Sequence, residues 1–481
     1  MELSRRDVLA AALAAAAIRP ASAETQDLAG LTIKKASDLL RRKTVSPVDL
    51  TEACLKRIDQ YNPTVNAYIT VTREQVLATA REMAEEQHRG KWRGPLHGIP
   101  VALKDNIDTA EIRTTGASEL FKDRIPTEDA EVVRRLKNAG AIILGKTNLH
   151  EFAYGTTSAV TYFKPVHNPW ALDRIPGGSS GGSAAATAAD LCLGSLGTDT
   201  GGSVRIPASY CGVVGFKPTY GRVSLRGIIP LSWTLDHAGP IVKTVEDAAL
   251  LLDAIAGFDE ADPSSADVPV ANYARAIALP TAKLRLGVPR APYFNNLDPE
   301  VAKAVETAIE VLKKHAAGVS DVVLPPANGL NLIGPEAYAY HAKWIAATPE
   351  LYQPPTRTIL QRSADLKASA YADALHKVYL LRREIKKVFD TVDLLITPTM
   401  PGPPVTIEAS ATQSASTRNT SPFDVYGLPT ISLPCGFTSS GLPIGLQISG
   451  APFAETTVLA LAHAYEQATE WHTRRPELKT A

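Results

Sequence analysis

Short apolar segments that alternate with helical patterns constrain the fold of this chain more than any other feature of its sequence. Each segment is bounded by Gly or Pro, as buried strands usually are. The segments occupy residues 99–103, 141–144, 213–216, 284–288, 394–397 and 431–433. Because helical patterns separate them over about 330 residues, we expect an α/β protein with a largely covered sheet.

Capping residues predict where the first two helices begin. Ser46 is followed by Pro47 in the first turn, which predicts a helix through residue 58. Thr72, with Gln75 three residues later, predicts a second helix that reaches about residue 87.

The organisation of the chain favours one large domain. Residues 259–270 are rich in Asp, Ser and Pro and predict a surface loop. No other segment resembles a linker, and no repeat is visible. We therefore predict one domain over residues 24–481, although roughly 150 residues per domain would suggest three.

The first residues resemble a twin-arginine export signal. Arg5 and Arg6 precede an Ala-rich apolar run, and Ala21-Ser22-Ala23 has the form of a signal peptidase site. A run of about 11 residues cannot span the roughly 30 Å of a bilayer core. The sequence therefore predicts a signal peptide over residues 1–23, export to the periplasm, and no membrane association after cleavage.

The balanced charge of the chain argues against nucleic acid and anionic membranes as partners. Lys plus Arg and Asp plus Glu both number 50, so no net field draws the protein to nucleic acid or to an anionic membrane. A small neutral substrate is easier to accommodate.

The cysteines form no metal-binding cluster and are predicted to be buried apolar residues, although export would permit a disulfide. They are Cys54, Cys192, Cys211 and Cys435.

Two loops rich in Gly and Ser carry the chemistry. The first reads Pro176-Gly-Gly-Ser179-Ser180-Gly-Gly-Ser183, and the second reads Gly197-Thr-Asp-Thr-Gly-Gly-Ser203-Val-Arg205. Such composition is typical of flexible linkers, but here the loops flank a helix over 184–189 and a predicted strand over 191–196. Glycines let main-chain N–H groups converge on a developing oxyanion. Ser203 is thus a candidate nucleophile.

Three other motif matches fail on their context. Residues 178–182 fit the G-x-S-x-G elbow, but no strand precedes them. Residues 140–147 fit the P-loop pattern, yet residues 132–139 are helical and 142–144 are themselves the strand. No S-x-x-K occurs. The sequence therefore does not favour an α/β-hydrolase, a nucleotide-binding protein or a penicillin-binding arrangement.

The nucleophile needs a base, and a lysine is the best candidate. None of His97, His150, His167 and His237 accompanies a matching acid in a recognisable context. Lys104 ends a buried strand, where loss of water would lower its pKa toward neutrality. The alternative role for Lys104 is a structural ion pair.

Taken together, these residues and several longer motifs resemble the amidase signature family. The motifs that carry the resemblance run in the family's order from about residue 30 to 470. They are Gly98-Ile-Pro-Val-Ala-Leu-Lys104-Asp-Asn, residues 139–152, the two loops above, Gly427-Leu-Pro429 and Leu433-Pro-Cys-Gly436. The resemblance implies a mixed sheet with helices on both faces and a signature core at about 95–220.

The resemblance also implies a catalytic triad and its surroundings. Ser203 matches the nucleophile, Ser179 the middle serine after a cis peptide bond, and Lys104 the base. The N–H groups of Thr200, Gly201, Gly202 and Ser203 match the oxyanion hole. Ser180, Asp199 and Arg205 match residues that brace the loops, and Ala153 matches a residue that lines the acyl pocket. No metal or organic cofactor is implied.

Hydrolysis of a small carboxylic amide through an acyl-enzyme on Ser203 is the predicted function. The first alternative is the glutamine-hydrolysing A subunit of a tRNA-dependent amidotransferase. Those subunits carry an acid before the equivalent of Gly427, whereas residues 417–420 have none and Asp424 lies close. A second alternative is an exported binding protein that keeps the fold without catalysis.

Overall fold

The computed structural model describes residues 27–478; the predicted signal peptide at 1–23 lies outside them. An eleven-stranded sheet crosses the described part of the chain in the order β1-β3-β2-β4-β6-β5-β10-β11-β9-β7-β8. The strands are β1 (Tyr68–Val71), β2 (Pro100–Lys104), β3 (Ile142–Thr147), β4 (Gly194–Asp199), β5 (Val214–Lys217), β6 (His237–Val242), β7 (Arg285–Val288), β8 (Gly318–Asp321), β9 (Leu394–Pro398), β10 (Thr430–Phe437) and β11 (Pro443–Gly450).

The sheet is mixed, as the resemblance implied. Strand β2 pairs in parallel with β3 and β4, and β7 pairs in parallel with β8 and β9. The remaining pairs are antiparallel. All six segments predicted as strands are strands. The strand expected over 191–196 begins later, at Gly194, and β1, β6, β8 and β11 were not predicted.

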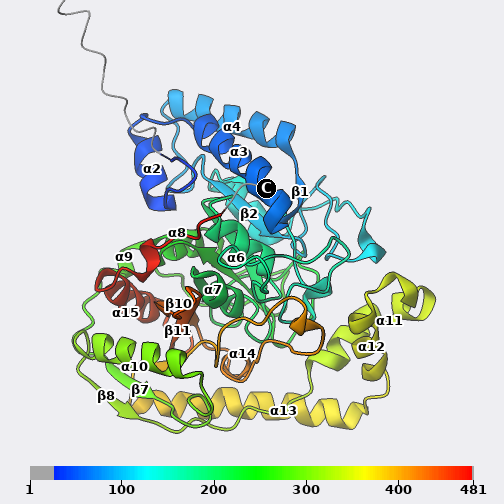
Figure 1. Cartoon of the computed structure of the whole chain (residues 1–481), viewed down its shortest axis with the longest axis vertical. Helices are drawn as coiled ribbons and strands as arrows, with labels where there is room; N and C mark the ends of the chain where they lie inside the picture. The colour runs from blue at the N-terminus through cyan, green and yellow to red at the C-terminus, as the bar shows by residue number, and fades with distance from the viewer. Residues whose placement is uncertain (1–26, 479–481) are drawn as a thin grey trace, which may run out of the picture.

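Helices cover both faces of the sheet (Figure 1). Ile241 packs with α6 (Gly181–Ala188) and α7 (Arg205–Cys211), whereas the next residue, Val242, packs with α8 (Val245–Ile255). Successive side chains of a strand point to opposite faces, so these helices lie on opposite sides. Further helices are α2 (Ile33–Arg41), α3 (Pro47–Val65), α4 (Arg73–His88), α5 (Glu131–Asn138), α9 (Tyr273–Ala276), α10 (Pro299–Lys313) and α15 (Glu455–Gln467).

Of the two predicted helix caps, one forms. The Ser46 side chain accepts from the backbone N–H of Asp49, and the Asp49 carboxylate accepts from Ser46 in return. Thr72 makes no capping bond, so that prediction is wrong in detail although α4 begins where expected. Its backbone, at ψ 65°, is not in the extended conformation that directs an N-cap hydroxyl toward the first turn.

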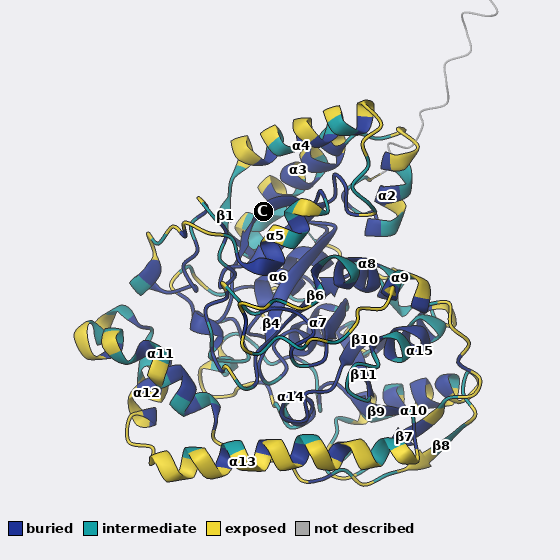
Figure 2. Ribbon diagram, turned by 180° about the vertical axis from the view of Figure 1, so that it is seen from behind, coloured by how far each residue is buried: buried dark blue, intermediate teal, exposed yellow. Residues whose placement is uncertain are grey.

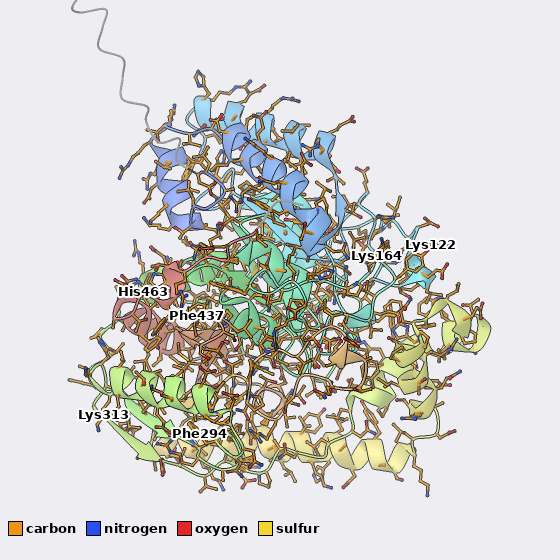
Figure 3. The ribbon with its side chains drawn as sticks, in the orientation of Figure 1. Lys122, Lys164, Phe294, Lys313, Phe437 and His463 are labelled. Carbon is orange, nitrogen blue, oxygen red and sulfur yellow. The ribbon has the colours of Figure 1, made fainter. Side chains whose placement is uncertain are left out.

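Several helices and loops lie outside the sheet. They include α11 (Ile333–Ala347), α12 (Pro354–Ser363), α13 (Ala368–Glu384) and α14 (Ser421–Val425), and Figure 2 shows α13 as largely exposed. The exposed side chains of Lys122, Lys164 and Lys313 lie at the margins of the molecule (Figure 3). Residues 259–270 hold no helix or strand, as predicted.

The four cysteines lie in the interior of the protein. All four cysteines are buried as free thiols, which confirms their predicted role as buried apolar residues. Between residues 27 and 478, no helix has both the length and the apolar character needed to cross a membrane.

Candidate active site

Lys104 occupies the end of β2, where the sheet buries its amine completely. Every residue of β2 is buried, because parallel strands flank both of its edges and the helices α3 and α6 pack against it. Lys104 Nζ donates to Ser179 Oγ at 2.7 Å and to Thr198 Oγ1 at 2.7 Å. Within the described residues no carboxylate lies at ion-pair distance, so neither close partner is an anion that would hold the proton on the amine.

Burial sets the protonation state of Lys104. Loss of water lowers its pKa to about 7, against the opposing effect of the negative charges on Asp236 and Asp199. A substantial fraction of Lys104 is therefore uncharged near neutral pH and can accept a proton. The prediction of a desolvated lysine at the end of a strand is confirmed.

The first Gly/Ser loop directs Ser179 at this amine. The peptide bond between Gly178 and Ser179 is cis, as the resemblance implied. Ser180 then ties the two loops together: its N–H donates to the Ser203 carbonyl oxygen at 3.2 Å, and its Oγ donates to the Thr198 carbonyl oxygen at 3.1 Å. The backbone segments of Ser179 and Ser203 are therefore neighbours.

The second loop leaves β4 and ends in α7, with the Asp199 carboxylate at its centre. This carboxylate accepts from the Val204 N–H at 3.1 Å and from Arg205 Nε at 2.9 Å. Burial alone would raise the pKa of Asp199, but the Arg205 guanidinium holds it well below its ordinary value. A permanent anion therefore fixes the turn that presents Ser203, in agreement with the predicted bracing role.

Gly202, one of the four residues predicted to form the oxyanion hole, braces the loop instead. The Gly202 N–H donates to Asp199 Oδ1 at 2.5 Å, so it is occupied and braces the loop. Among the described residues, no acceptor bonds the N–H groups of Thr200, Gly201 and Ser203. These three donors remain available to an oxyanion.

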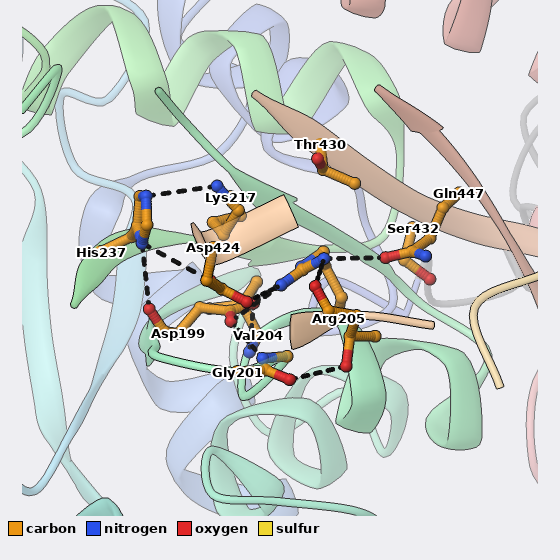
Figure 4. Close-up of polar contacts among 12 residues, drawn as sticks. Asp199, Gly201, Val204, Arg205, Lys217, His237, Asp424, Thr430, Ser432 and Gln447 are labelled. Atoms are coloured by element: carbon orange, nitrogen blue, oxygen red, sulfur yellow. Dashed lines mark hydrogen bonds and ion pairs between the residues drawn. The ribbon is translucent and has the colours of Figure 1, made fainter. Parts of the chain in front are cut away.

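Arg205 connects the loop to the far side of the site (Figure 4). It is fully buried and donates to Asp424 at 2.7 Å, to the Thr420 carbonyl oxygen at 3.0 Å and to Gln447 Oε1 at 2.9 Å. Asp424, the acid closest to Gly427 in the sequence, is thus engaged by Arg205. It is 0% exposed and does not line the cavity described below.

His237 belongs to the same buried network rather than to Ser203. Its Nδ1 lies 3.2 Å from the Asp199 carbonyl oxygen, and its Nε2 lies 3.2 Å from Lys217 Nζ (Figure 4). Burial, together with the charge on Lys217, lowers the pKa of His237 well below its ordinary value. This histidine is therefore neutral and structural.

A cavity of about 900 Å³ opens beside Ser203. Ala153, which the resemblance placed in the acyl pocket, lies in its wall with Thr200 and Gly201. None of the described side chains that line the cavity is an Asp, Glu, Lys or Arg. The apolar members of the wall include Ala153, Ala159, Val160, Leu231, Ile333, Ile359 and Ile407.

Three residues around the site escaped sequence reasoning. Thr198 bonds the lysine amine, Asp236 accepts from the Thr200 hydroxyl at 2.5 Å, and His150 lines the cavity. His150 lies in the motif at residues 139–152 and was a candidate base, but its place in the cavity wall was not predicted. Asp236 comes from an unpredicted strand border, so only the tertiary fold brings it to the loop.

Comparison with known proteins finds a match to the Amidase family model over residues 49–459. The A subunit of the glutamyl-tRNA(Gln) amidotransferase from Moorella thermoacetica is 43% identical over 483 residues, covering 94% of this chain and 99% of that protein. An amidase from Pseudomonas putida is 43% identical over 469 residues, covering 94% and 98%. The solved peptide amidase from Stenotrophomonas maltophilia has a TM-score of 0.84 at 32% identity, covering 95% and 99%.

Proposed function

Because the chain belongs to the amidase family, we propose that it hydrolyses an uncharged carboxylic amide to acid plus ammonia or amine. The observation that carries the proposal is the 2.7 Å contact between the buried Lys104 amine and Ser179 Oγ, in a loop bonded to Ser203. The uncharged wall of the cavity supports the restriction to uncharged amides, since a buried charge without a partner is costly.

The proposed reaction moves one proton through the two serines. Neutral Lys104 accepts the proton of Ser179, which takes the proton of Ser203 as Ser203 Oγ attacks the carbonyl carbon. The N–H groups of Thr200, Gly201 and Ser203 stabilise the oxyanion. When the carbon–nitrogen bond breaks, the proton returns through Ser179 to the leaving amine. Water then hydrolyses the acyl ester and restores the enzyme.

Labelling with a fluorophosphonate tests the nucleophile. We expect one phosphonyl group per chain on Ser203, no label in Ser203→Ala, and turnover of a panel of neutral amides that differ in acyl length and amine. A native protein that takes no label and hydrolyses no amide would instead support a binding protein with this fold.

Glutamine hydrolysis within a tRNA-dependent amidotransferase is the second candidate. Its support is the 43% identity to the A subunit of a glutamyl-tRNA(Gln) amidotransferase. Glutamine brings an ammonium and a carboxylate, for which the described wall offers no charged partner, and Asp424 is occupied by Arg205. Glutaminase activity that rises only with partner subunits and tRNA would favour this candidate over a free-standing amidase.

Export is proposed from the sequence pattern of residues 1–23 alone. Fusion of these residues to a reporter should direct it to the periplasm, and replacement of Arg5 and Arg6 by Lys should retain it in the cytoplasm. A reporter that stays in the cytoplasm with the native segment would contradict the proposal.

A further inference from the structure

The turn from Leu231 to Asp236 connects the oxyanion loop to the cavity wall through one carboxylate. The Asp236 carboxylate accepts from the Thr200 hydroxyl at 2.5 Å. Its other oxygen accepts from the N–H groups of Leu231 at 2.9 Å and Ser232 at 3.1 Å. Thr200 carries one of the three free oxyanion donors, and both Thr200 and Leu231 line the cavity. The position of Asp236 therefore affects where the Thr200 N–H lies.

The turn depends on other elements for its place in the protein. Trp233, at its tip, is 49% exposed, so packing holds the tip only in part. Within the turn, the N–H groups of Leu235 and Asp236 donate to the Ser232 carbonyl oxygen at 3.2 and 2.8 Å. These two bonds set the shape of the turn but do not tie it to the helices around it.

Glu336 on α11 is the carboxylate that anchors the turn from outside. It is 3% exposed, and its Oε2 accepts from the Thr234 N–H at 3.1 Å and from the Ser232 hydroxyl. Its Oε1 accepts from the Thr234 hydroxyl at 2.5 Å and from the Tyr371 hydroxyl of α13 at 2.8 Å. Since an ionised carboxylate only accepts hydrogen bonds, the direction of all four is fixed.

Arg382 of α13 is the other charged side chain outside the turn that bonds it within the described part of the chain. Its guanidinium donates to the Thr234 carbonyl oxygen at 2.7 Å and to the Val425 carbonyl oxygen at 3.1 Å. It also lies over the Tyr220 ring, 4.2 Å from the centroid. Arg382 is therefore shared among several elements, whereas three of the four bonds of Glu336 go to the turn.

We propose that Glu336 is a positioning residue for the reaction. By holding the turn, it keeps Asp236 on the Thr200 hydroxyl and thereby keeps the Thr200 N–H directed at the oxyanion. This inference rests on the proposed amidase function. Because an oxyanion donor acts chiefly in the transition state, loss of the anchor should lower the maximum rate much more than the affinity for the substrate.

Three substitutions separate the position of the turn from the charge of its anchor. Glu336→Leu removes every acceptor. Glu336→Gln removes only the charge, because its oxygen can accept from the Thr234 N–H while its amide nitrogen donates to the Thr234 hydroxyl, which can also accept. Tyr371→Phe removes one donor to the same carboxylate from outside the turn and is the matched control.

The rate at which a fluorophosphonate labels Ser203 measures the effect without knowledge of the natural substrate. It is resolved into a maximum rate and a half-saturating concentration. We expect Glu336→Leu to lower the maximum rate about 10- to 100-fold, up to the effect of losing one oxyanion donor. Glu336→Gln should recover most of that rate, and Tyr371→Phe should keep it. Turnover of hexanamide, a small neutral amide, should follow the same order.

The pH profile is a readout that a merely structural role would not move. Asp236 and Asp199 are the two anions that favour the protonated form of Lys104, so a displaced turn carries one of them away. From pH 5 to 9, the inflection of the labelling rate should move to lower pH in Glu336→Leu and stay in place in Glu336→Gln. In Asp236→Asn, the added Glu336→Leu change should cause no further shift.

Two results would overturn the inference. One is Glu336→Leu that has the native circular dichroism spectrum and labels at the native rate; the other is Glu336→Gln that is as slow as Glu336→Leu. Should Glu336→Leu not fold, Ser232→Ala decides, because it removes one donor from inside the turn as Tyr371→Phe removes one from outside. Equal rates for these two variants would also overturn the inference.

Failure of the proposed function gives a different result. A native protein that takes no label and hydrolyses no amide would refute the amidase function itself. A native protein that is labelled at Ser203, with variants that behave alike, would leave that function standing and refute only the role of Glu336.

Discussion

Lys104 is a buried amine whose two closest bonds go to hydroxyl groups rather than carboxylates. Removal of this amine should abolish the route by which Ser203 loses its proton. We expect Lys104→Ala to lower the rate of Ser203 acylation by about 1,000-fold or more, with the circular dichroism spectrum of the native fold. Stopped-flow acylation measures the rate. Near-native turnover across the pH range would contradict a lysine base.

The charge on Asp236 should set the pH at which the enzyme becomes active. The pKa of Lys104 is about 7, and the Asp236 and Asp199 carboxylates both raise it. Since only the uncharged amine accepts a proton, kcat/KM should rise with pH through about 7 and then level off. Asp236→Asn removes one anion, so the protonated lysine loses stabilisation and the inflection should move to lower pH.

Measurement of kcat/KM from pH 5 to 9 on both proteins checks this expectation. Burial raises the pKa of Asp236 to about 6, so at lower pH the native enzyme also loses this anion. The kcat/KM profiles of the native enzyme and of Asp236→Asn should therefore converge at low pH. An inflection that stays in place, or that moves upward, would show that Asp236 does not act on the Lys104 proton.

At the level of single residues, the sequence predicted the site residues that belong to its motifs, but not the residues that only the tertiary fold brings to the site. Ser179, Ser203 and Lys104 could be predicted because each belongs to a long motif. Asp236 could not, because its contact with Thr200 joins positions 36 residues apart. The Gly202 N–H escaped prediction for a different reason: its bond to Asp199, only three residues away, depends on the exact turn of the loop.

Among the elements, α6 depends on a close approach that only glycine permits. A Cβ at Gly182 would overlap the carbonyl oxygen of Asn148 and lie 2.6 Å from that of Ala67, and both are backbone atoms that cannot rotate away. Gly182→Ala should therefore lower the free energy of unfolding by about 3 kcal/mol. Urea unfolding measures the change.

Gly318, at the start of β8, provides the matched control. A Cβ there meets no heavy atom within 4 Å, so Gly318→Ala should change the free energy of unfolding by no more than about 0.5 kcal/mol. Equal effects of the two substitutions would indicate that the contacts of Gly182 are not the cause.

Two of the four strands that were not predicted, β6 and β11, contain residues that are unusual in a strand. Gly239 in β6 lets the Phe216 carbonyl oxygen approach where a Cβ would stand, and β6 also contains Pro240. In β11, the buried Gln447 and Ser449 break the apolar pattern. Sequence rules count Gly, Pro and buried polar residues against a strand, whereas here they serve close packing and the Arg205 network.

For the whole molecule, the uncharged cavity is assembled from distant parts of the chain. Its wall combines residues from 150–165, from 200–203, from α11 and α12, and from 407–417. Thr417 lies in this wall, where an added carboxylate would give an ammonium group of the substrate the charged partner that the wall lacks. Thr417→Asp should therefore raise kcat/KM for an amide with a free ammonium about 10-fold relative to hexanamide.

The matched control lies five residues away on the same loop. Thr412 is exposed and does not line the cavity, so Thr412→Asp changes net charge equally without placing it at the substrate. Screening by salt should reduce a remote effect more than a local one; the Thr417→Asp preference should therefore persist in about 0.5 M NaCl. If both variants shifted the ratio alike, the selectivity would arise from overall charge, and the uncharged wall would not be what selects neutral amides.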